Sequence, residues 1–232
     1  MNNQVVICGV DESGRGAVIG PLVICVVCLD EDGVKKIASI VTSDREVKDD
    51  SVRKLIYLRT KKFIKRLEYV IIDPPVIDYF VSQGLLNEML ASYMALAIAN
   101  IVQSGYMPWI VKIDSPVKKW YVFKKAVLDY FTALEIPIPK QNIFVKIGLD
   151  EEDSIVALAG VLAKLKRDTI IQQLKKKFGD FGSGYPSDVR TRTWLRKIIE
   201  KGEELPPIVR KTWTTVETIM EEVKKRKQLV SK

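Results

Sequence analysis

Histidine is absent from this 232-residue chain. Its absence excludes Ser-His-Asp and Cys-His triads, imidazole acid–base catalysis and every metal site with a histidine ligand. A metal bound to this chain therefore needs oxygen ligands, which favours a hard cation such as Mg²⁺ or Mn²⁺.

Cysteine is scarce. Cys8, Cys25 and Cys28 form no pattern typical of a secreted disulfide framework. Cys25 and Cys28 have the spacing of a metal or redox pair, but the chain has no second pair to complete a zinc site. Both lie inside an apolar run, where cysteine behaves as a small buried hydrophobe. We therefore expect them to be core residues.

Long apolar runs are also missing. The longest covers residues 17–29, contains Gly20 and Pro21, and is too short to span a bilayer. The N-terminus shows no basic segment of a signal peptide, so we expect a cytoplasmic protein without membrane contact. The chain is 47% hydrophobic, enough for one sizeable core, and its net charge of +8 favours a polyanionic partner such as nucleic acid.

Two adjacent carboxylates interrupt the first apolar stretch. Residues 4–10 are followed by Asp11 and Glu12, then by Gly14-Arg15-Gly16, before an apolar run resumes. Side chains alternate across a strand, so either one acid faces solvent or a metal lies where both can reach it. The glycines allow the backbone to bend or approach a ligand closely. The alternative is an inert polar connection between two strands.

The hydrophobic pattern predicts an α/β fold. Strands are expected at residues 4–10, 17–29, about 36–41, 69–72, 109–113 and 142–147. Helices are expected at residues 51–65, 76–81, 86–103, 120–134, 153–177, 189–201 and 215–228. This order indicates a mixed sheet, with antiparallel first strands and then parallel strands, flanked by helices. We expect residues 1–178 to form the main domain and residues 179–232 a helical extension docked on it.

Several predicted strands end in aspartate. Carboxylates at the carboxyl ends of neighbouring parallel strands can converge, which makes Asp114 and Asp150 candidate partners of the first two acids. Four such groups repel one another unless cations lie among them, and a pair of divalent ions is the usual solution. Asp30 is expected at the opposite edge of the sheet, and Asp73 is a candidate helix cap.

Motifs along most of the chain resemble the type 2 ribonucleases H, specifically ribonuclease HII. The most specific are the segments 9–16 and 182–188, the latter followed by Thr191. The others are residues 19–22, 86–88, 113–116, 163–164, 167–168 and 207–213, the last resembling archaeal members. The resemblance covers roughly residues 4–215.

This resemblance implies a ribonuclease H fold and a metal-dependent nuclease. The four metal-binding acids would fall on Asp11, Glu12, Asp114 and Asp150, with two Mg²⁺ or Mn²⁺ ions bound during turnover. The implied substrates are RNA/DNA hybrids and single ribonucleotides embedded in duplex DNA. The family's Gly-Arg-Gly, which holds the ribonucleotide, would be Gly14, Arg15 and Gly16, and its junction-binding tyrosine would be Tyr185.

These roles are chemically reasonable because the 2′-hydroxyl alone distinguishes a ribonucleotide from its neighbours. Tyr185 can offer its hydroxyl to that group and its ring to the adjacent deoxysugar; the alternative is a buried tyrosine that pins the loop to the core. Ser183 lies in the same loop. Further substrate contacts are expected from basic residues at this loop and at the tail motif (residues 207–213): Arg190, Arg192, Arg210 and Lys211.

Three positions depart from the family pattern. Ser13 stands where alanine is usual. Residues 48–51 stand where Asp-Ser-Lys is usual, so the phosphate-contacting lysine is lost or displaced to Lys48 or Arg53. Acids also crowd the fourth metal position, where a one-turn shift of the helix start would favour Asp153 over Asp150.

We therefore predict a monomeric endoribonuclease acting in ribonucleotide excision repair. Metal-bound water would attack the phosphate 5′ to a ribonucleotide, giving 5′-phosphate and 3′-hydroxyl ends. The alternatives are a ribonuclease H-fold DNA nuclease of the junction-resolving kind and a catalytically inactive hybrid-binding protein. The last residues lack the paired aromatics of a sliding-clamp-binding tail, so no clamp partner is predicted.

Overall fold

The computed structural model describes residues 5–41, 47 and 49–230. Its centre is a five-stranded sheet of order β3-β2-β1-β4-β5. β1 (Val6–Ser13) pairs antiparallel with β2 (Leu22–Asp30) and parallel with β4 (Ile110–Asp114), which pairs parallel with β5 (Ile143–Lys146). β3 (Arg66–Ile72) is the other edge strand. The predicted mixed sheet is confirmed.

The chain divides into two compact units. The first contains Met1–Ser13, Val23–Val70 and Leu86–Lys166, and the second contains Gly14–Leu22, Ile71–Leu85 and Arg167–Lys232. Both units are assembled from segments far apart in the sequence. The expected division into residues 1–178 and 179–232, with a substrate-binding role for the second part, stays a prediction.

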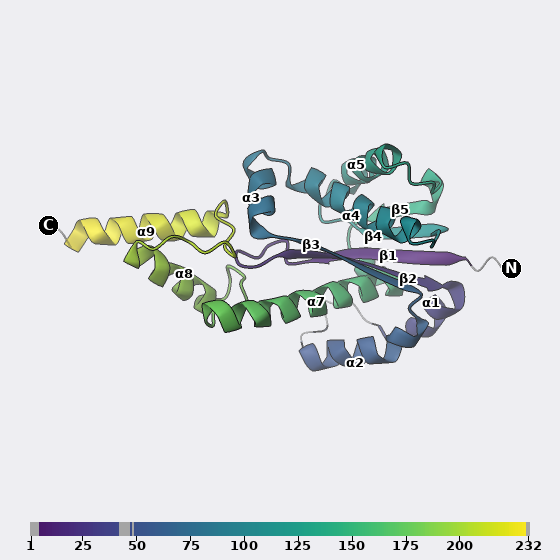
Figure 1. The fold of residues 1–232 in the computed structure, drawn as a ribbon, viewed down its shortest axis with the longest axis horizontal. Coiled ribbons are helices and arrows are strands. Elements are labelled where there is room, and N and C mark those ends of the chain that lie inside the picture. Colours follow the sequence, from purple (N-terminus) through teal and green to yellow (C-terminus); the bar gives the residue numbers. More distant parts are fainter. Residues whose placement is uncertain (1–4, 42–46, 48, 231–232) are drawn as a thin grey trace. The chain divides into compact units, whose positions relative to one another are not determined.

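Helices cover both faces of the sheet in the first unit (Figure 1). α4 (Leu86–Gln103) and α5 (Trp120–Ala133) lie on one face. The other carries α1 (Glu31–Ile37), α2 (Asp50–Thr60) and the first half of α7 (Ser154–Phe178). Single turns of 3₁₀ helix occupy Lys61–Phe63 and Lys140–Asn142, and a short helix, α6 (Leu149–Glu152), precedes α7.

The core of the first unit explains why α7 begins with an unbroken apolar run. Residues 155–163 are buried, and they pack against Cys25, Val27 and Leu29, which share one face of β2. Gly9 in β1 permits the close approach, because a Cβ there would lie 2.6 Å from the carbonyl carbon of Ile155. A glycine in the strand therefore marks the place where the helix meets the sheet.

Two predicted elements need correction. The strand expected near residues 36–41 is wrong, because residues 31–37 form α1, whose first turn is capped by Asp30 accepting a hydrogen bond from Gly33 N at 2.7 Å. The strand expected at residues 17–29 begins only at Leu22. Of residues 17–21, Ile19 alone makes a β-bridge, with Val209.

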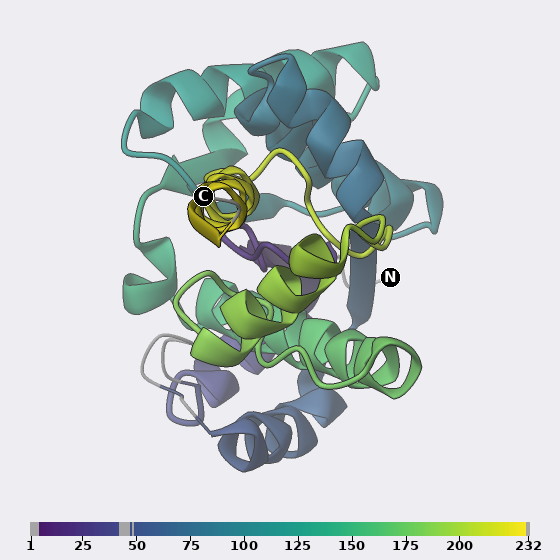
Figure 2. The same cartoon turned by 90° about the vertical axis from the view of Figure 1, so that its left-hand side faces the viewer.

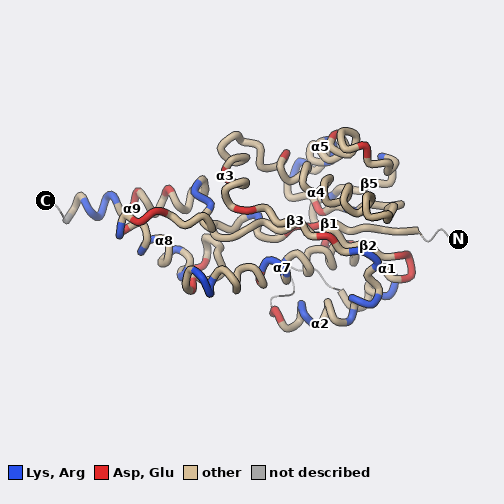
Figure 3. Tube along the Cα trace, viewed as in Figure 1, with Lys and Arg blue, Asp and Glu red and all other residues tan. Residues whose placement is uncertain are grey.

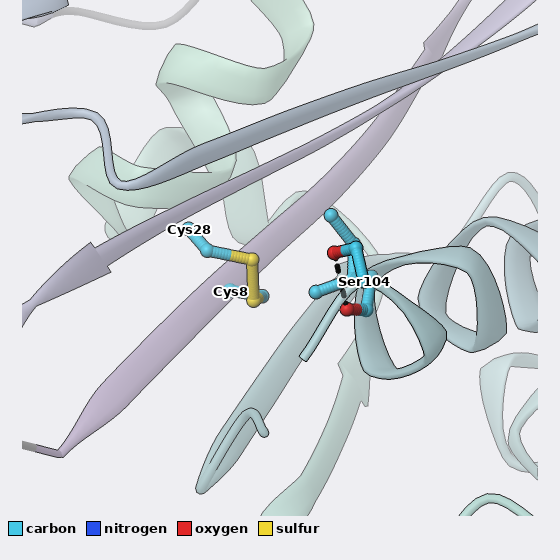
Figure 4. The surroundings of a disulfide bond; sticks show 4 residues. Cys8, Cys28 and Ser104 are labelled. Carbon is cyan, nitrogen blue, oxygen red and sulfur yellow. Dashed lines mark hydrogen bonds between the residues drawn. A yellow bond between two sulfur atoms is a disulfide. The ribbon is translucent and has the colours of Figure 1, made fainter. Parts of the chain in front are cut away.

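Cysteine burial is as predicted, but one covalent link is not. All three cysteines are fully buried, and Cys25 is a free thiol. Cys8 and Cys28 are directly opposed in the β1–β2 register, with their Cα atoms 4.1 Å apart, and form a disulfide (Figure 4). The pairing depends on strand register, which composition and spacing do not provide.

The second unit has its own core. It contains α3 (Pro74–Ser82), the second half of α7, α8 (Val189–Lys201) and α9 (Thr214–Val230). α8 and α9 lie side by side (Figure 2). Buried apolar residues line these helices, including Leu195, Val216 and Ile219. Lys and Arg gather in the last turns of α9 (Figure 3).

None of the helices in the described ranges combines the length and apolar content that crossing a bilayer requires.

Candidate functional site

Three of the predicted acids come together in the first unit because of strand order. β1 and β4 are parallel neighbours with Val10 paired to Ile113, so Asp11 and Asp114 follow at the same edge of the sheet. Asp150 belongs to α6, directly after the next strand. All three carboxyl groups are buried, with at most 8% of each residue exposed. Neighbouring parallel strands thus place acids from distant parts of the chain near one another.

The electrostatics of Asp11 show how closely these acids interact. Burial raises the pKa of Asp11 well above its ordinary value, and the charges of Glu12, Asp114 and Asp150 raise it further. A hydrogen bond from Glu12 N at 2.7 Å opposes these effects only in part. The neighbouring carboxylates therefore destabilise the charged form of Asp11, and a bound cation would relieve that repulsion.

The donor chemistry of the acids fits a hard divalent cation, because every ligand offered is a carboxylate oxygen. Within the described residues, however, no three carboxylate or thiol groups are arranged to hold an ion. Asp114 accepts a hydrogen bond from Leu149 N at 2.7 Å, so one of its oxygens is used by the backbone. The four acids are neighbours, not a closed coordination shell.

Asp150 and Asp153, the two candidates for the fourth acid, have different surroundings. Asp153 forms an ion pair with Lys112 and accepts a hydrogen bond from Ile155 N at 3.1 Å at the start of α7. Asp150, in contrast, acts electrostatically on Asp11. Asp150 as the fourth acid stays a prediction.

The second unit contains the glycine-rich loop at residues 14–22. Gly14 has φ +90°, a conformation that L side chains rarely adopt, and a Cβ there would lie 2.6 Å from Cδ of Arg167. Gly16 is exposed, and a Cβ on it would meet no atom within 4 Å. The loop therefore has a tightly packed side at Gly14 and an open side at Gly16.

Backbone hydrogen bonds connect the glycine-rich loop to the Tyr185 loop, which is residues 182–188. The carbonyl of Gly184 accepts hydrogen bonds from Val18 N at 2.8 Å and Ile19 N at 3.0 Å. Tyr185 is half-buried, and the guanidinium carbon of Arg167 lies 4.8 Å from its ring centroid. Two motifs separated by about 170 residues thus form one local structure.

Two side chains hold the Tyr185 loop in shape. The Thr191 hydroxyl donates to the carbonyl of Phe181 at 2.8 Å and accepts from Gly184 N at 3.0 Å. Asp188 accepts from Ser183 N at 2.7 Å and from Arg190 N at 2.9 Å, which caps α8. Burial raises the pKa of Asp188, but these hydrogen bonds outweigh burial and lower the pKa to about 2.

Comparison with known proteins identifies the family. The model of the family described as Ribonuclease HII matches residues 8–216 of this chain. The chain belongs to the ribonuclease HII family. It is accordingly a hydrolytic endonuclease with ribonuclease H activity, and this family acts on RNA/DNA hybrids.

Individual ribonucleases HII match almost the whole chain. The enzyme of Pyrococcus furiosus is 34% identical over 219 residues, which are 94% of this chain and 93% of the relative. That of Caldivirga maquilingensis is 36% identical over 208 residues, or 90% and 91% of the two chains.

Solved structures show the same fold. The crystal structure of ribonuclease H2 from Pyrococcus horikoshii has a TM-score of 0.82 at 31% identity, covering 95% of this chain and 100% of its own. The ribonuclease HII of Archaeoglobus fulgidus, solved in a complex with PCNA, has a TM-score of 0.76 at 31% identity and covers 92% and 96%. A ribonuclease HIII solved with Mn²⁺ shares the fold at 19% identity.

The other substrate contacts predicted for this ribonuclease HII have varied surroundings. Ser183, Arg190 and Lys211 are exposed. Arg190 forms an ion pair with Asp188 at 3.4 Å, and the Lys211 ammonium lies 3.5 Å from a carboxylate of Glu204. Their contacts with substrate stay predictions.

The displaced phosphate-contacting lysine is not located. Lys48 lies outside the described residues. Arg53, the other candidate, is only 6% exposed and forms an ion pair with Asp50 at 2.9 Å. Its guanidinium is therefore committed inside the fold.

The expected contact of Arg210 with substrate needs correction. Its side chain is fully buried, and its guanidinium donates to the carbonyls of Gly14, Arg15 and Gly20. A buried guanidinium surrounded by backbone oxygens has no surface to offer a phosphate. Arg210 belongs to the interior of the unit.

Three residues were missed as functional candidates: Arg167, Thr191 and Asp78. Arg167 and Thr191 lie in motifs shared with the family, which was the available signal, but no role followed from it. Asp78 accepts hydrogen bonds from Lys211 N at 2.8 Å and Thr212 N at 3.0 Å, which holds the tail motif. Nothing in its local sequence distinguishes it from an ordinary surface aspartate.

Proposed function

We propose that this ribonuclease HII cuts at single ribonucleotides embedded in duplex DNA as well as in RNA/DNA hybrids. Cleavage would fall on the phosphate 5′ to a ribonucleotide and leave 5′-phosphate and 3′-hydroxyl ends. The observation that carries the proposal is the hydrogen bonding of the Gly184 carbonyl to Val18 N and Ile19 N, which joins the glycine-rich loop to the Tyr185 loop.

The joined loops suit recognition of a single sugar. Gly16 is open on the side where a Cβ would project, so its backbone can approach a sugar without a clash. Tyr185 can offer its hydroxyl to the 2′-hydroxyl, and its ring is held beside Arg167. A position selective for one ribonucleotide needs such hydrogen-bonding groups placed in advance.

The proposed metal ligands are Asp11, Glu12, Asp114 and Asp150. None of them belongs to the glycine-rich loop at residues 14–22. When bound there, Mg²⁺ or Mn²⁺ would supply Lewis-acid stabilisation of charge on the phosphate and would lower the pKa of water. The hydrogen bond from Leu149 N keeps the Asp114 carboxylate oriented. Because the chain lacks histidine, no imidazole is available as the base.

A duplex with one embedded ribonucleotide tests this function. With Mg²⁺ or Mn²⁺ the enzyme should cut it once, at the predicted phosphate, and ligation or end-labelling identifies the two ends. Asp114→Asn should bind the duplex but leave it intact, which excludes a contaminating nuclease. An uncut duplex, or faster cutting of branched all-DNA substrates, would contradict the proposal and favour a junction-resolving nuclease.

Three further expectations accompany this function: a monomer, a cytoplasmic location and no clamp-binding tail. Light scattering on the purified chain checks the first, and microscopy of a tagged chain in its own cells checks the second. A pull-down with the chain's own PCNA-type clamp checks the third, and capture of the clamp would contradict it.

A further inference from the structure

Two arginines in the second unit are completely buried, although neither belongs to the proposed chemistry. Arg167 and Arg210 are the two largest side chains with essentially no exposed surface. Arginine is rarely buried unless its charge is paired. Here both guanidinium groups donate hydrogen bonds to backbone carbonyls of residues 14–21.

Arg210 holds the first side of the glycine-rich loop. Its Nη2 donates to the carbonyl of Gly14 at 2.7 Å, and Nη1 donates to the carbonyl of Arg15 at 2.9 Å. The same guanidinium reaches Gly20 across the loop, with Nε at 3.2 Å and Nη2 at 3.0 Å from its carbonyl oxygen. One planar fork thus fixes both ends of the turn that presents Gly16.

Arg167 holds the returning side of the loop and also the tyrosine. Its Nη2 donates to the carbonyl of Ile19 at 3.1 Å, and Nε donates to that of Pro21 at 3.3 Å. The guanidinium carbon lies 4.8 Å from the ring centroid of Tyr185. Arg167 therefore contacts both parts of the proposed sugar-recognition structure.

We propose that Arg167 and Arg210 are positioning residues that fix the glycine-rich loop and Tyr185 in their sugar-recognising arrangement before substrate binds. This inference rests on the proposed function. Each guanidinium group donates several hydrogen bonds in one plane. A lysine ammonium keeps the charge but cannot reproduce this arrangement of donors. The side chains need not touch the nucleic acid, because they act through the backbone they hold.

Burying two cations close together is unfavourable, and this cost supports a functional reason for keeping them. Burial and the neighbouring charge of Arg167 lower the pKa of Arg210 to about 9. Apolar side chains of similar volume would often serve stability as well. The carbonyl contacts, in contrast, define the curvature of the loop.

The test compares Arg167→Lys and Arg210→Lys with Arg196→Lys. Arg196 is an arginine of the same unit whose guanidinium pairs with Glu222 of α9. On the duplex with one embedded ribonucleotide, the first two variants should lose about tenfold or more in kcat with a smaller change in KM, because misplaced groups cost rate. Arg196→Lys should stay within about twofold of the natural enzyme.

Two readouts separate positioning from a general loss of folding. In hydrogen exchange, amides of residues 14–22 should exchange faster in Arg210→Lys, while amides of α8 and α9 keep their protection. In a double-mutant cycle, Arg167→Lys should cost less kcat in a Tyr185→Ala background than in the natural enzyme, because part of its effect passes through the contact with Tyr185 and the rest through the carbonyls of Ile19 and Pro21.

The outcomes are distinct. Lysine variants with natural kcat, unchanged exchange of residues 14–22, or an Arg167→Lys effect independent of Tyr185 would each overturn the positioning role while leaving the proposed function intact. A natural enzyme that shows no preference for the embedded ribonucleotide over all-DNA duplex would refute the proposed function, and the positioning role with it.

Discussion

Alanine at Gly14 should destabilise the protein far more than alanine at Gly16, although only one residue separates them. At Gly14, φ is +90°, and a non-glycine residue held in such a region costs roughly 1–3 kcal/mol. The new Cβ would also lie 2.6 Å from Cδ of Arg167 and 2.8 Å from the Pro21 carbonyl oxygen. Overpacking of this kind typically costs about 1–3 kcal/mol. We expect Gly14→Ala to lower the free energy of unfolding by about 3 kcal/mol or more.

Gly16→Ala should leave stability within about 1 kcal/mol of the natural protein. A Cβ there meets no atom within 4 Å, and the residue is not among those with positive φ. The restricted unfolded chain can even make such a change slightly stabilising. The new methyl group would, however, stand where the backbone is proposed to approach the sugar. Cleavage at an embedded ribonucleotide should therefore fall while folding is unaffected.

Urea unfolding measures the difference in stability, provided that the slope of unfolding free energy against urea concentration is the same for the natural protein, Gly14→Ala and Gly16→Ala. Cleavage of the duplex with one embedded ribonucleotide measures the loss of activity expected for Gly16→Ala. Equal destabilisation by the two substitutions would refute the account of the loop's packed and open sides. A fully active Gly16→Ala enzyme would refute recognition by close backbone approach.

Three other changes have defined outcomes. Asp11→Asn should abolish cleavage. In EDTA, however, this variant should unfold at a higher urea concentration than the natural enzyme, and the difference between the two midpoints should grow as pH rises, because burial and neighbouring carboxylates raise the pKa of Asp11 in the folded state. An equal or lower urea midpoint would contradict this. Asp188→Ala should lower the free energy of unfolding by about 1–2 kcal/mol at pH 7. This loss of stability should shrink as pH falls from 3.8 through about 2, since the folded-state pKa of Asp188 lies below the ordinary value. A loss that is constant with pH would show that the charge of Asp188 is irrelevant. Replacing Cys8 and Cys28 with alanine should lower the free energy of unfolding by about 3 kcal/mol, because the link joins residues 20 apart in the sequence; equal urea midpoints under oxidising conditions would argue against the link.

The sequence was most informative where local pattern and chemistry coincide. The acids at the end of the first strand, the helices at residues 86–103 and 189–201, and the mixed sheet all followed from periodicity and strand order. Asp150 was preferred to Asp153 as the fourth acid, although both stand near one helix start. Asp153 forms an ion pair with Lys112, 41 residues away, and the local sequence does not reveal such a partner.

Long-range pairing was beyond prediction. Nothing local indicates that Cys8 opposes Cys28, because register is decided by the whole sheet. Arg210 was expected to contact substrate because it lies in the basic motif at residues 207–213. Its acceptors are carbonyls almost 200 positions earlier in the chain, and the sequence gives no sign of such partners.

The hydrogen bonds from Arg210 to the glycine-rich loop also determine an order of events in folding. The loop is translated within the first 22 residues, yet the groups that hold it include residues 184, 208 and 210. Contacts between such distant segments form late, because a long stretch of chain must first be closed. A nascent chain can therefore pair β1 with β2 early, whereas the loop reaches its final shape only after the C-terminal segment has left the ribosome.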